Sequence, residues 1–285
     1  MKKFLLLLLS AVPLLCTAQQ LENSLLWKIT GNGLKEPSYL YGTVHITCDA
    51  MLDKNVIAAL DATRQLYLEL DMDSPSLQTE MMGYMIMKDG KKMSQLASPE
   101  DFEIVNSFLT KNLGMSAKMV DSFKPAMVSM MLLPKMIDCS IQSVEAELIN
   151  VTQSQNEEIY GLETVGDQMK IFDAIPYEEQ MEQLVKTAKD NMASDKEMYK
   201  KMIAIYNSKN LNAILDFMKE EDNKMYGDHS DVMLDSRNKS WIKKIEETAK
   251  ATPTFFGVGA AHLPGENGVI NLLRQKGYTV EAVTQ

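Results

Sequence analysis

Two of the three histidines in this chain follow one pattern, an apolar, strand-like run that ends in Gly-x-x-His. The first run is SYLYGTVHI, with Gly42 and His45, and the second is TFFGVGAAHL, with Gly259 and His262. A glycine three residues before the histidine lets the backbone turn tightly and present the ring at the sheet edge. The matched pair predicts two imidazoles that converge on one pocket and share a metal ion. The alternative is a pair of structural histidines that cap strand ends.

Glu69 and Glu163 are the carboxylates that could join the histidines. Glu69 follows the apolar run LYL, where an acid is costly to bury unless it is paired or binds a metal. It could instead face solvent on a half-exposed strand. Glu163 stands in YGLETVGDQM, after a short strand-like segment, and could be a ligand or a general base. It could equally be a first-turn acid that complements a helix dipole.

Arg237 lies in LDSRNKSWI, a segment with the spacing of an amphipathic helix. A guanidinium can form two parallel hydrogen bonds with a carboxylate, so Arg237 could clamp a substrate carboxylate or orient Glu163. It could also be an ordinary surface arginine, and the spacing does not decide. The third histidine, His229, lies in the polar stretch YGDHSD and is expected to face solvent.

The surroundings of the two Gly-x-x-His runs predict how they are positioned. Each run is followed by a predicted helix, NVIAALDATRQ or NGVINLLRQKG, and then by a strand that contains glutamate, LYLELD or YTVEAV. This order looks like a diverged β-α-β repeat, whose halves would pair in one sheet around a pseudo-dyad. The two loops would then face each other. The alternative is chance similarity between two common units.

The other elements follow from turn signals, helix caps and apolar spacing. SLLWKIT and SYLYGTVHI are predicted strands around the turn GNGLKEP, and a helix over 53–65 follows with Asp53 as its N-cap. In the helical middle, Ser98 caps one helix, a methionine-rich helix kinks at Pro134, and EEIYGLE forms a short strand. The methionines could fill a core or form an adaptable groove for a peptide.

These elements predict an α/β (α+β) fold, a central mixed sheet built from two diverged β-α-β repeats, with a large helical insertion. We expect a single domain at 19–285. Within it, 19–75 and 251–285 form the sheet halves, and about 76–250 forms the mainly helical insertion.

The first eighteen residues have the features of a cleaved secretory signal peptide. Lys2 and Lys3 precede an apolar stretch, and small residues lead up to Ala18, so we expect cleavage there and export to the periplasm or the extracellular space. Cys16 raises the alternative of a lipid anchor, but Leu15 is too bulky for the usual lipoprotein cleavage site. No later stretch approaches the roughly 18 apolar residues of a membrane span, so we expect no direct span.

Charge and cysteine content limit the partners and the compartment. The net charge is −10, and it becomes about −12 once two lysines leave with the signal peptide, which disfavours nucleic acid and anionic membranes as partners. The remaining cysteines, Cys48 and Cys139, most simply form one disulfide in an oxidising compartment. The alternative is two buried free thiols. The sequence carries no signal for the oligomeric state.

Five motifs together resemble the TraB/PrgY/GumN family, which includes the Tiki proteases that act on Wnt proteins. The resemblance covers essentially the whole mature chain, and its last motif is long and specific. The motifs are LYGTVHI, ELD at Glu69, YGLETVGDQ at Glu163, SRN at Arg237 and GVGAAHLPGENGVINLLRQKGY.

The resemblance implies a metal-dependent hydrolase with an α/β core related to the erythromycin-esterase and ChaN-like fold. Carried over by motif, it implicates a site of His45, Glu69, Glu163, Arg237 and His262. It also implies that manganese or cobalt supports activity. The segment SVEA (143–146) departs from the Gly-x-Asp pattern of many relatives, and it is assigned no role.

The first hypothesis is therefore metal-assisted hydrolysis of a peptide or protein substrate. Two imidazoles and one or two carboxylates would hold one divalent cation (Mn, Co or Zn), because mixed nitrogen and oxygen ligands suit these metals. We assign Glu69 to the metal and Glu163 to the general base or a ligand, and these two could exchange roles. Arg237 would bind a substrate carboxylate or the developing oxyanion.

The second hypothesis is a non-catalytic protein that binds metal, haem or a peptide in the same pocket. A third is a scaffold that has lost its metal. Haem needs an axial ligand and a flat apolar slot, and no separate signature of these is visible. The sequence has no Gly-x-Ser-x-Gly elbow, HExxH helix or glycine-rich phosphate loop, which disfavours a serine hydrolase, a zincin and a nucleotide enzyme.

Overall fold

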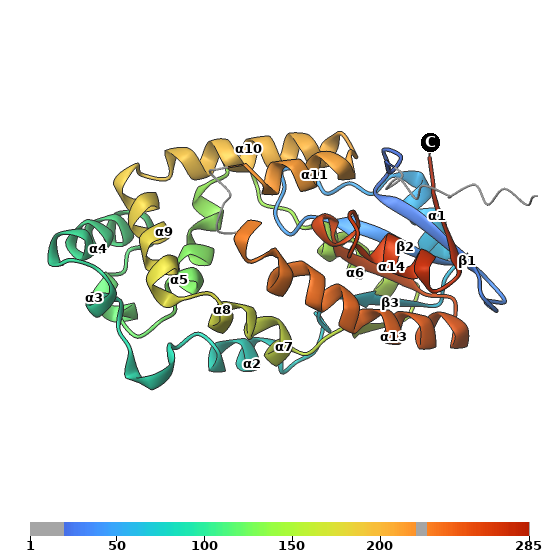
Figure 1. Ribbon diagram of the computed structural model, residues 1–285, viewed down its shortest axis with the longest axis horizontal. Helices are drawn as coiled ribbons and strands as arrows, with labels where there is room; N and C mark the ends of the chain where they lie inside the picture. Colours follow the sequence, from blue (N-terminus) through green and yellow to red (C-terminus); the bar gives the residue numbers. More distant parts are fainter. Residues whose placement is uncertain (1–19, 221–226, 285) are drawn as a thin grey trace, which may run out of the picture.

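Among the described residues the strands form one mixed six-stranded sheet with the order β4-β3-β5-β2-β1-β6. The sheet lies toward one end of the molecule (Figure 1). The computed structural model describes residues 20–220 and 227–284, so the expected signal peptide lies outside the described residues. The strands are β1 (Leu26–Gly31), β2 (Ser38–Thr43), β3 (Gln65–Leu68), β4 (Glu158–Gly161), β5 (Phe255–Gly259) and β6 (Tyr278–Ala282). The predicted mixed sheet is confirmed.

Helices fill most of the chain between β3 and β5, as predicted. Ser98 caps α4, since its hydroxyl accepts a hydrogen bond from the Asp101 amide at 3.1 Å. Asp53 stands at the start of α1 without a side-chain capping bond, because its carboxylate instead pairs with Lys209. The helices are α1 (Lys54–Asp61), α2 (Leu77–Gly83), α3 (Met93–Leu96), α4 (Pro99–Leu113), α5 (Pro125–Leu132), α6 (Val144–Ser154), α7 (Val165–Met169), α8 (Ile171–Ala174), α9 (Tyr177–Lys189), α10 (Ala193–Asn207), α11 (Leu211–Met218), α13 (Ser236–Ala251) and α14 (Val269–Gln275).

The two strands that precede the Gly-x-x-His histidines, β2 and β5, are parallel neighbours at the centre of the sheet. Their ends are nearly level, because Thr43 at the end of β2 lies opposite Gly259 at the end of β5. β3 pairs with the other side of β5, and β4 follows it, both in parallel. On the opposite side, β1 pairs antiparallel with β2 and with β6. Both Gly-x-x-His loops therefore leave the same edge of the sheet.

The two β-α-β units leave this central pair in opposite directions. From β2 the chain crosses past β5 to β3, and from β5 it crosses past β2 and β1 to β6. Right-handed crossovers in opposite directions place α1 and α14 on opposite faces of the sheet. Such a switch point opens a crevice beyond the carboxyl ends of the strands, where ligands bind in α/β folds. The predicted pairing of the two halves in one sheet is confirmed.

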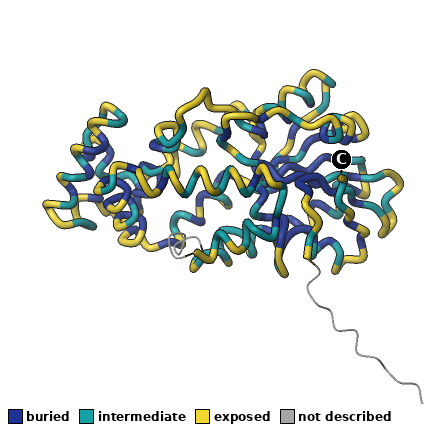
Figure 2. The backbone as a smooth tube through the Cα atoms, turned by 90° about the horizontal axis from the view of Figure 1, so that it is seen from above, coloured by how far each residue is buried: buried dark blue, intermediate teal, exposed yellow. Residues whose placement is uncertain are grey.

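Buried apolar residues gather in separate clusters (Figure 2). The larger cluster surrounds the sheet, where Trp27, Leu40, Phe255 and Phe256 are fully buried. A second cluster lies among α3, α4, α5 and α9, at the end of the molecule away from the sheet (Figure 1). The methionines divide between core and surface: Met93, for example, is fully buried there, whereas others are exposed. No helix among the described residues is both long and apolar enough to cross a membrane.

The loop that carries His45 is fastened to the start of α6. Cys48 and Cys139 form a disulfide with their Cα atoms 5.8 Å apart, which confirms the predicted bond. Next to it, the backbones of Thr47 and Gln142 exchange two hydrogen bonds of 2.9 and 3.0 Å. Segments about a hundred residues apart in sequence are thereby held together beside the sheet edge.

Candidate functional site

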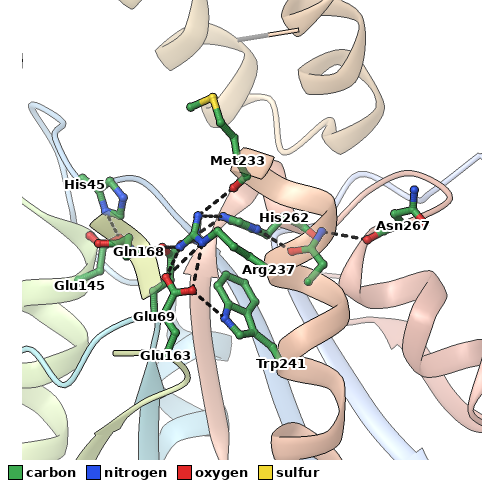
Figure 3. A network of polar contacts seen from close by, with 12 residues as sticks. His45, Glu69, Glu145, Glu163, Gln168, Met233, Arg237, Trp241, His262 and Asn267 are labelled. Atoms are coloured by element: carbon green, nitrogen blue, oxygen red, sulfur yellow. Dashed lines mark hydrogen bonds and ion pairs between the residues drawn. The ribbon is translucent and has the colours of Figure 1, made fainter. Parts of the chain in front are cut away.

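Arg237, near the start of α13, has a guanidinium group surrounded by polar partners (Figure 3). Its Nη2 donates to Glu69 Oε2 and to Glu163 Oε1, both at 2.6 Å, and its Nε donates to Glu163 at 3.1 Å. Only 12% of the Arg237 side chain is exposed, with 10% for Glu69 and 5% for Glu163. These three charged groups are therefore largely removed from water and satisfied by one another.

The two glutamates lie side by side because the pairing of β3 with β4 continues beyond the strands. The Leu162 amide donates to the Leu68 carbonyl at 2.8 Å, and the Glu163 amide donates to the Glu69 carbonyl at 3.0 Å. Gly161 permits this approach, since a Cβ there would lie 2.6 Å from a backbone nitrogen of the neighbouring segment. Thr164 then caps α7, so Glu163 precedes the helix and is not a first-turn acid.

His262, in the turn after β5, presents one nitrogen to the same cluster. Its Nδ1 lies 2.6 Å from Asn238 Oδ1, and Asn238 Nδ2 donates to the backbone carbonyls of His262 and Asn267. The amide oxygen of Asn238 therefore accepts, which places the imidazole hydrogen on Nδ1. Nε2 keeps its lone pair, accepts a hydrogen bond from Arg237 Nη1 at 3.0 Å and lies 3.6 Å from Glu69 Oε1.

Burial and neighbouring charges shift the pKa values of His262, Glu69 and Glu163 in different directions. Desolvation lowers the pKa of His262 to about 3, so the ring is neutral at neutral pH. Burial also raises the pKa of Glu69, but the electrostatic effect of His262, Arg237 and His45 outweighs it and lowers this pKa to about 2. In Glu163 burial prevails over the neighbouring Arg237, and the pKa is raised. Two adjacent carboxylates thus differ in how readily they take a proton.

The two motif glycines act through close approach rather than through a turn that only glycine can make. Neither has a positive φ. The Gly259 amide donates to Glu69 Oε1 at 2.8 Å, and a Cβ on Gly259 would lie 3.3 Å from that oxygen. A Cβ on Gly42 would lie 3.1 Å from Ala260 in the other Gly-x-x-His loop. The motif glycines therefore allow the two loops and Glu69 to pack closely.

His45 has a different partner from the one expected. Its ring is 68% exposed, and Nδ1 donates to Glu145 Oε1 at 2.7 Å. Glu145 is buried in the first turn of α6, where Ser143 Oγ donates to its other oxygen at 2.8 Å. The hydrogen bond to Glu145 raises the pKa of His45 to about 9, so the ring is protonated at neutral pH. The pair lies beside the Arg237 cluster in Figure 3.

The structure thus joins Glu69, Glu163, Arg237 and His262 directly and places His45 beside them with Glu145. Sequence reasoning assigned no role to Glu145 and did not single out Asn238. A signal existed for Glu145, because Ser143 two residues earlier marks a helix start. His229 does not face solvent as expected: only 21% of its side chain is exposed, and it bonds Glu179 of α9 at 2.9 Å.

Within the described residues, no group of three His, Cys, Asp or Glu side chains is arranged to hold a metal ion. The donors are present, but the guanidinium of Arg237 stands among them. The shared metal ligation by His45 and His262 therefore stays a prediction.

A cavity of about 510 Å³ opens beside the cluster. Glu163 and Arg237 line it, together with Leu162, Asp167, Lys170, Ile171, Ala174, Val232, Ser236 and Ser240. Glu69 and His262 are not among the described residues that line it. A molecule in this cavity would therefore meet Glu163 and Arg237 first.

Comparison with known proteins gives one family and one distant relative. The chain matches the TraB/PrgY/gumN family over residues 25–282. It is also similar to "Metalloprotease TIKI2" of Danio rerio, with 20% identity over 321 aligned residues that cover 93% of this chain. The match covers 62% of that relative, so the chain spans less than two thirds of its length. No solved structure matches the chain significantly.

Proposed function

Because the chain belongs to the TraB/PrgY/gumN family, we propose that it is an exported, metal-dependent hydrolase that cleaves a peptide or protein substrate. One observation carries the proposal: burial keeps His262 neutral, and its bond to Asn238 leaves the lone pair on Nε2, which accepts from Arg237 and lies 3.6 Å from Glu69 Oε1. The likeness to a metalloprotease over 93% of the chain agrees with this chemistry. The disulfide is consistent with an oxidising compartment outside the cytoplasm.

The donor types suit a divalent cation, although the guanidinium of Arg237 stands among these donors in the structure. One imidazole nitrogen with a fixed tautomer and carboxylate oxygens suit Mn, Co or Zn, and an imidazole ligand typically donates its other N–H to a neighbouring acceptor, as Nδ1 does here to Asn238. We assign His262 and Glu69 to the cation, with Glu163 next to them. When bound, the cation supplies a Lewis acid that polarises a carbonyl group and lowers the pKa of water.

Glu163 is the proton carrier in this proposal. It lines the 510 Å³ cavity, whereas Glu69 does not, so it can reach a substrate from the open side. Trp241 Nε1 and Arg237 hold its two oxygens in place, and burial raises its pKa, which makes it a stronger base than Glu69, whose pKa is lowered. Glu163 can therefore take a proton from water and pass it to a leaving amine.

Arg237 and His45 provide positive charge around the substrate. Arg237 lines the same cavity, so a substrate carboxylate or a developing oxyanion there would lie next to its positive charge. His45 is protonated and exposed, and Glu145 fixes its orientation, so Nε2 can donate a proton to a group that enters the crevice. These roles need no movement of the two residues that we assign to the cation.

Cleavage of a peptide library by the chain from Gln19 onward, loaded in turn with Mn²⁺, Co²⁺ and Zn²⁺, tests the proposal. Glu163→Gln should lower turnover by at least about 100-fold, the usual contribution of a general base, with the fold retained. Glu158→Gln is the matched control, because Glu158 lies on β4 with an exposed side chain. Equal turnover in Glu163→Gln and the wild type would remove Glu163 from the mechanism.

The alternative is a non-catalytic protein that binds metal, haem or a peptide. One observation favours it, namely that Arg237 already satisfies both carboxylates and His262 without a cation. The same library experiment separates the two. Peptides that bind without being cut under every metal would support the binding protein, and a coloured preparation with haem absorption would identify haem.

A further inference from the structure

The guanidinium of Arg237 uses all five of its N–H groups. Nε–H and one N–H of Nη2 point to Glu163, and the second N–H of Nη2 points to Glu69. The two N–H groups of Nη1 point to the Met233 carbonyl at 3.0 Å and to His262 Nε2 at 3.0 Å. A fully satisfied guanidinium in a site removed from water is a strongly bound internal cation.

The acceptors that Arg237 uses are the donors that a metal ion requires. The Nε2 atom of His262 has one lone pair, and this lone pair already accepts the hydrogen bond from Nη1. It cannot bind a cation at the same time. Glu69 has one oxygen bonded to Arg237 and Gln168 and the other bonded to the Gly259 amide.

We propose that Arg237 and a divalent cation are alternative occupants of this cluster, so that the metal binds only when the guanidinium withdraws from His262 and Glu69. The inference rests on the cation of the proposed function and concerns how its binding is controlled. The guanidinium has a place to go, because Arg237 also lines the 510 Å³ cavity beside Glu163. Metal binding would thus release the guanidinium from His262 and Glu69 and leave it free to bind a substrate group in the cavity.

Charge supports this exchange. Arg237 forms ion pairs with two carboxylates, Glu69 and Glu163, and the Nε2 atom of His262 only accepts a hydrogen bond, so the guanidinium is the one cation against two acids. A divalent cation that displaces Arg237 keeps both carboxylates compensated. Removal of the arginine without replacement leaves two buried carboxylates uncompensated, which strongly favours uptake of another cation.

Calorimetric titration of the chain from Gln19 onward with Mn²⁺ or Zn²⁺ measures the competition. Arg237→Met should bind the metal at least about tenfold more tightly than the wild type, because a buried carboxylate pair has lost its cation. Arg274→Met is the matched control, since Arg274 donates to the Val280 carbonyl and packs over the Trp27 ring, and it should bind as the wild type does. Equal or weaker binding by a folded Arg237→Met protein would overturn the proposal.

The wild type provides a second measurement that does not depend on the folding of a variant. The chain contains three arginines, Arg64, Arg237 and Arg274, so the ¹⁵N guanidinium spectrum is simple. Diamagnetic Zn²⁺ should make the separate Nη signals of Arg237 merge as the bonds to His262 and Glu69 are released. The signals of Arg274 should stay unchanged. Stoichiometric Zn²⁺ binding that leaves Arg237 unchanged would refute the exchange.

The outcomes also separate this inference from the proposed function. Metal-dependent cleavage together with equal affinities in wild type and Arg237→Met would sustain the hydrolase and reject the exchange. No metal binding by either protein would reject both the exchange and the metal-dependent function. Tight binding by Arg237→Met and weak binding by the wild type would support the exchange even for a protein that cuts no peptide.

Discussion

The pair formed by His45 and Glu145 gives a quantitative prediction for the pKa of an imidazole. Glu145→Gln replaces a buried carboxylate by a neutral amide of nearly the same shape, which can still accept a hydrogen bond from Nδ1. The variant therefore removes the charge and keeps the contact. We expect the pKa of His45 to fall toward the ordinary histidine value.

The magnitude follows from the exposure of the ring. The hydrogen bond with Glu145 raises the pKa of His45 from 6.5 to about 9. The His45 side chain is 68% exposed, however, and solvent screens an ion pair at such a position, so the change that we expect in solution is about one pKa unit. The wild-type ring should then titrate above about 7.5, and the ring in Glu145→Gln should titrate near the usual 6.5.

Imidazole NMR measures this directly, because the chain has three histidines. His262 should show no titration in the same range, since its pKa is lowered to about 3. Glu147→Gln is the control: Glu147 also lies in the first turn of α6, so it tests the effect of the helix end without the bond to His45. A wild-type pKa at or below 6.5, or equal shifts in both variants, would refute the reasoning.

The same pair fixes the sign of a pH effect on stability. The folded pKa of His45 lies above its unfolded value, so its contribution is complete below about 6.5 and is lost as the pH rises from about 7.5 toward 9. The difference in unfolding free energy between the wild type and Glu145→Gln should therefore shrink over this window. Denaturation with urea at a series of pH values measures it.

Three further predictions concern the disulfide, a motif glycine and acid stability. Replacing both Cys48 and Cys139 with serine should lower the unfolding free energy by about 2–4 kcal/mol, because the bond joins residues 91 apart in the sequence. Urea denaturation measures this, and a loss below about 1 kcal/mol would contradict the prediction. Gly259→Ala should lower peptide turnover at least about tenfold with a nearly unchanged melting temperature, since its Cβ crowds Glu69 Oε1 at 3.3 Å, and unchanged turnover would count against the role of that contact. The ion pair of Glu69 should stabilise the fold fully above about pH 4.5 and lose this effect as the pH falls toward about 2. In acid denaturation followed by circular dichroism, the stability of Glu69→Gln should therefore depend less on pH over this range than that of the wild type.

The sequence predicted the parts of the site that depend on local pattern. The apolar runs before His45 and His262 predicted strands, and their matched surroundings predicted that the two halves pair in one sheet with the loops facing each other. The parallel pairing of β2 and β5 confirms the shared sheet and places both loops at one edge of it. Ser98 correctly predicted the start of α4, because a helix cap depends only on a few neighbouring residues.

The contacts that tune the site were not predictable from such patterns. Glu145 reaches His45 because a disulfide and a backbone bridge hold segments a hundred residues apart, and no local spacing encodes that register. The place of Arg237 depends on which face of α13 packs against the sheet. The motif glycines were predicted to allow a tight turn. In the structure neither has a positive φ, and both allow close packing, Gly42 against Ala260 and Gly259 against Glu69.

The two Gly-x-x-His motifs end in histidines that differ in charge at neutral pH, one neutral and one positive. His262 is buried against Asn238 and Trp241 and stays neutral, whereas His45 is exposed, paired with Glu145 and protonated. A neutral imidazole offers a lone pair, and a protonated one offers a hydrogen. The repeated strand-and-loop backbone therefore positions both imidazoles at the same sheet edge, and the segments packed around each loop determine the protonation state of its ring. For this reason we assign the cation to the His262 half of the site and proton donation to the His45 half.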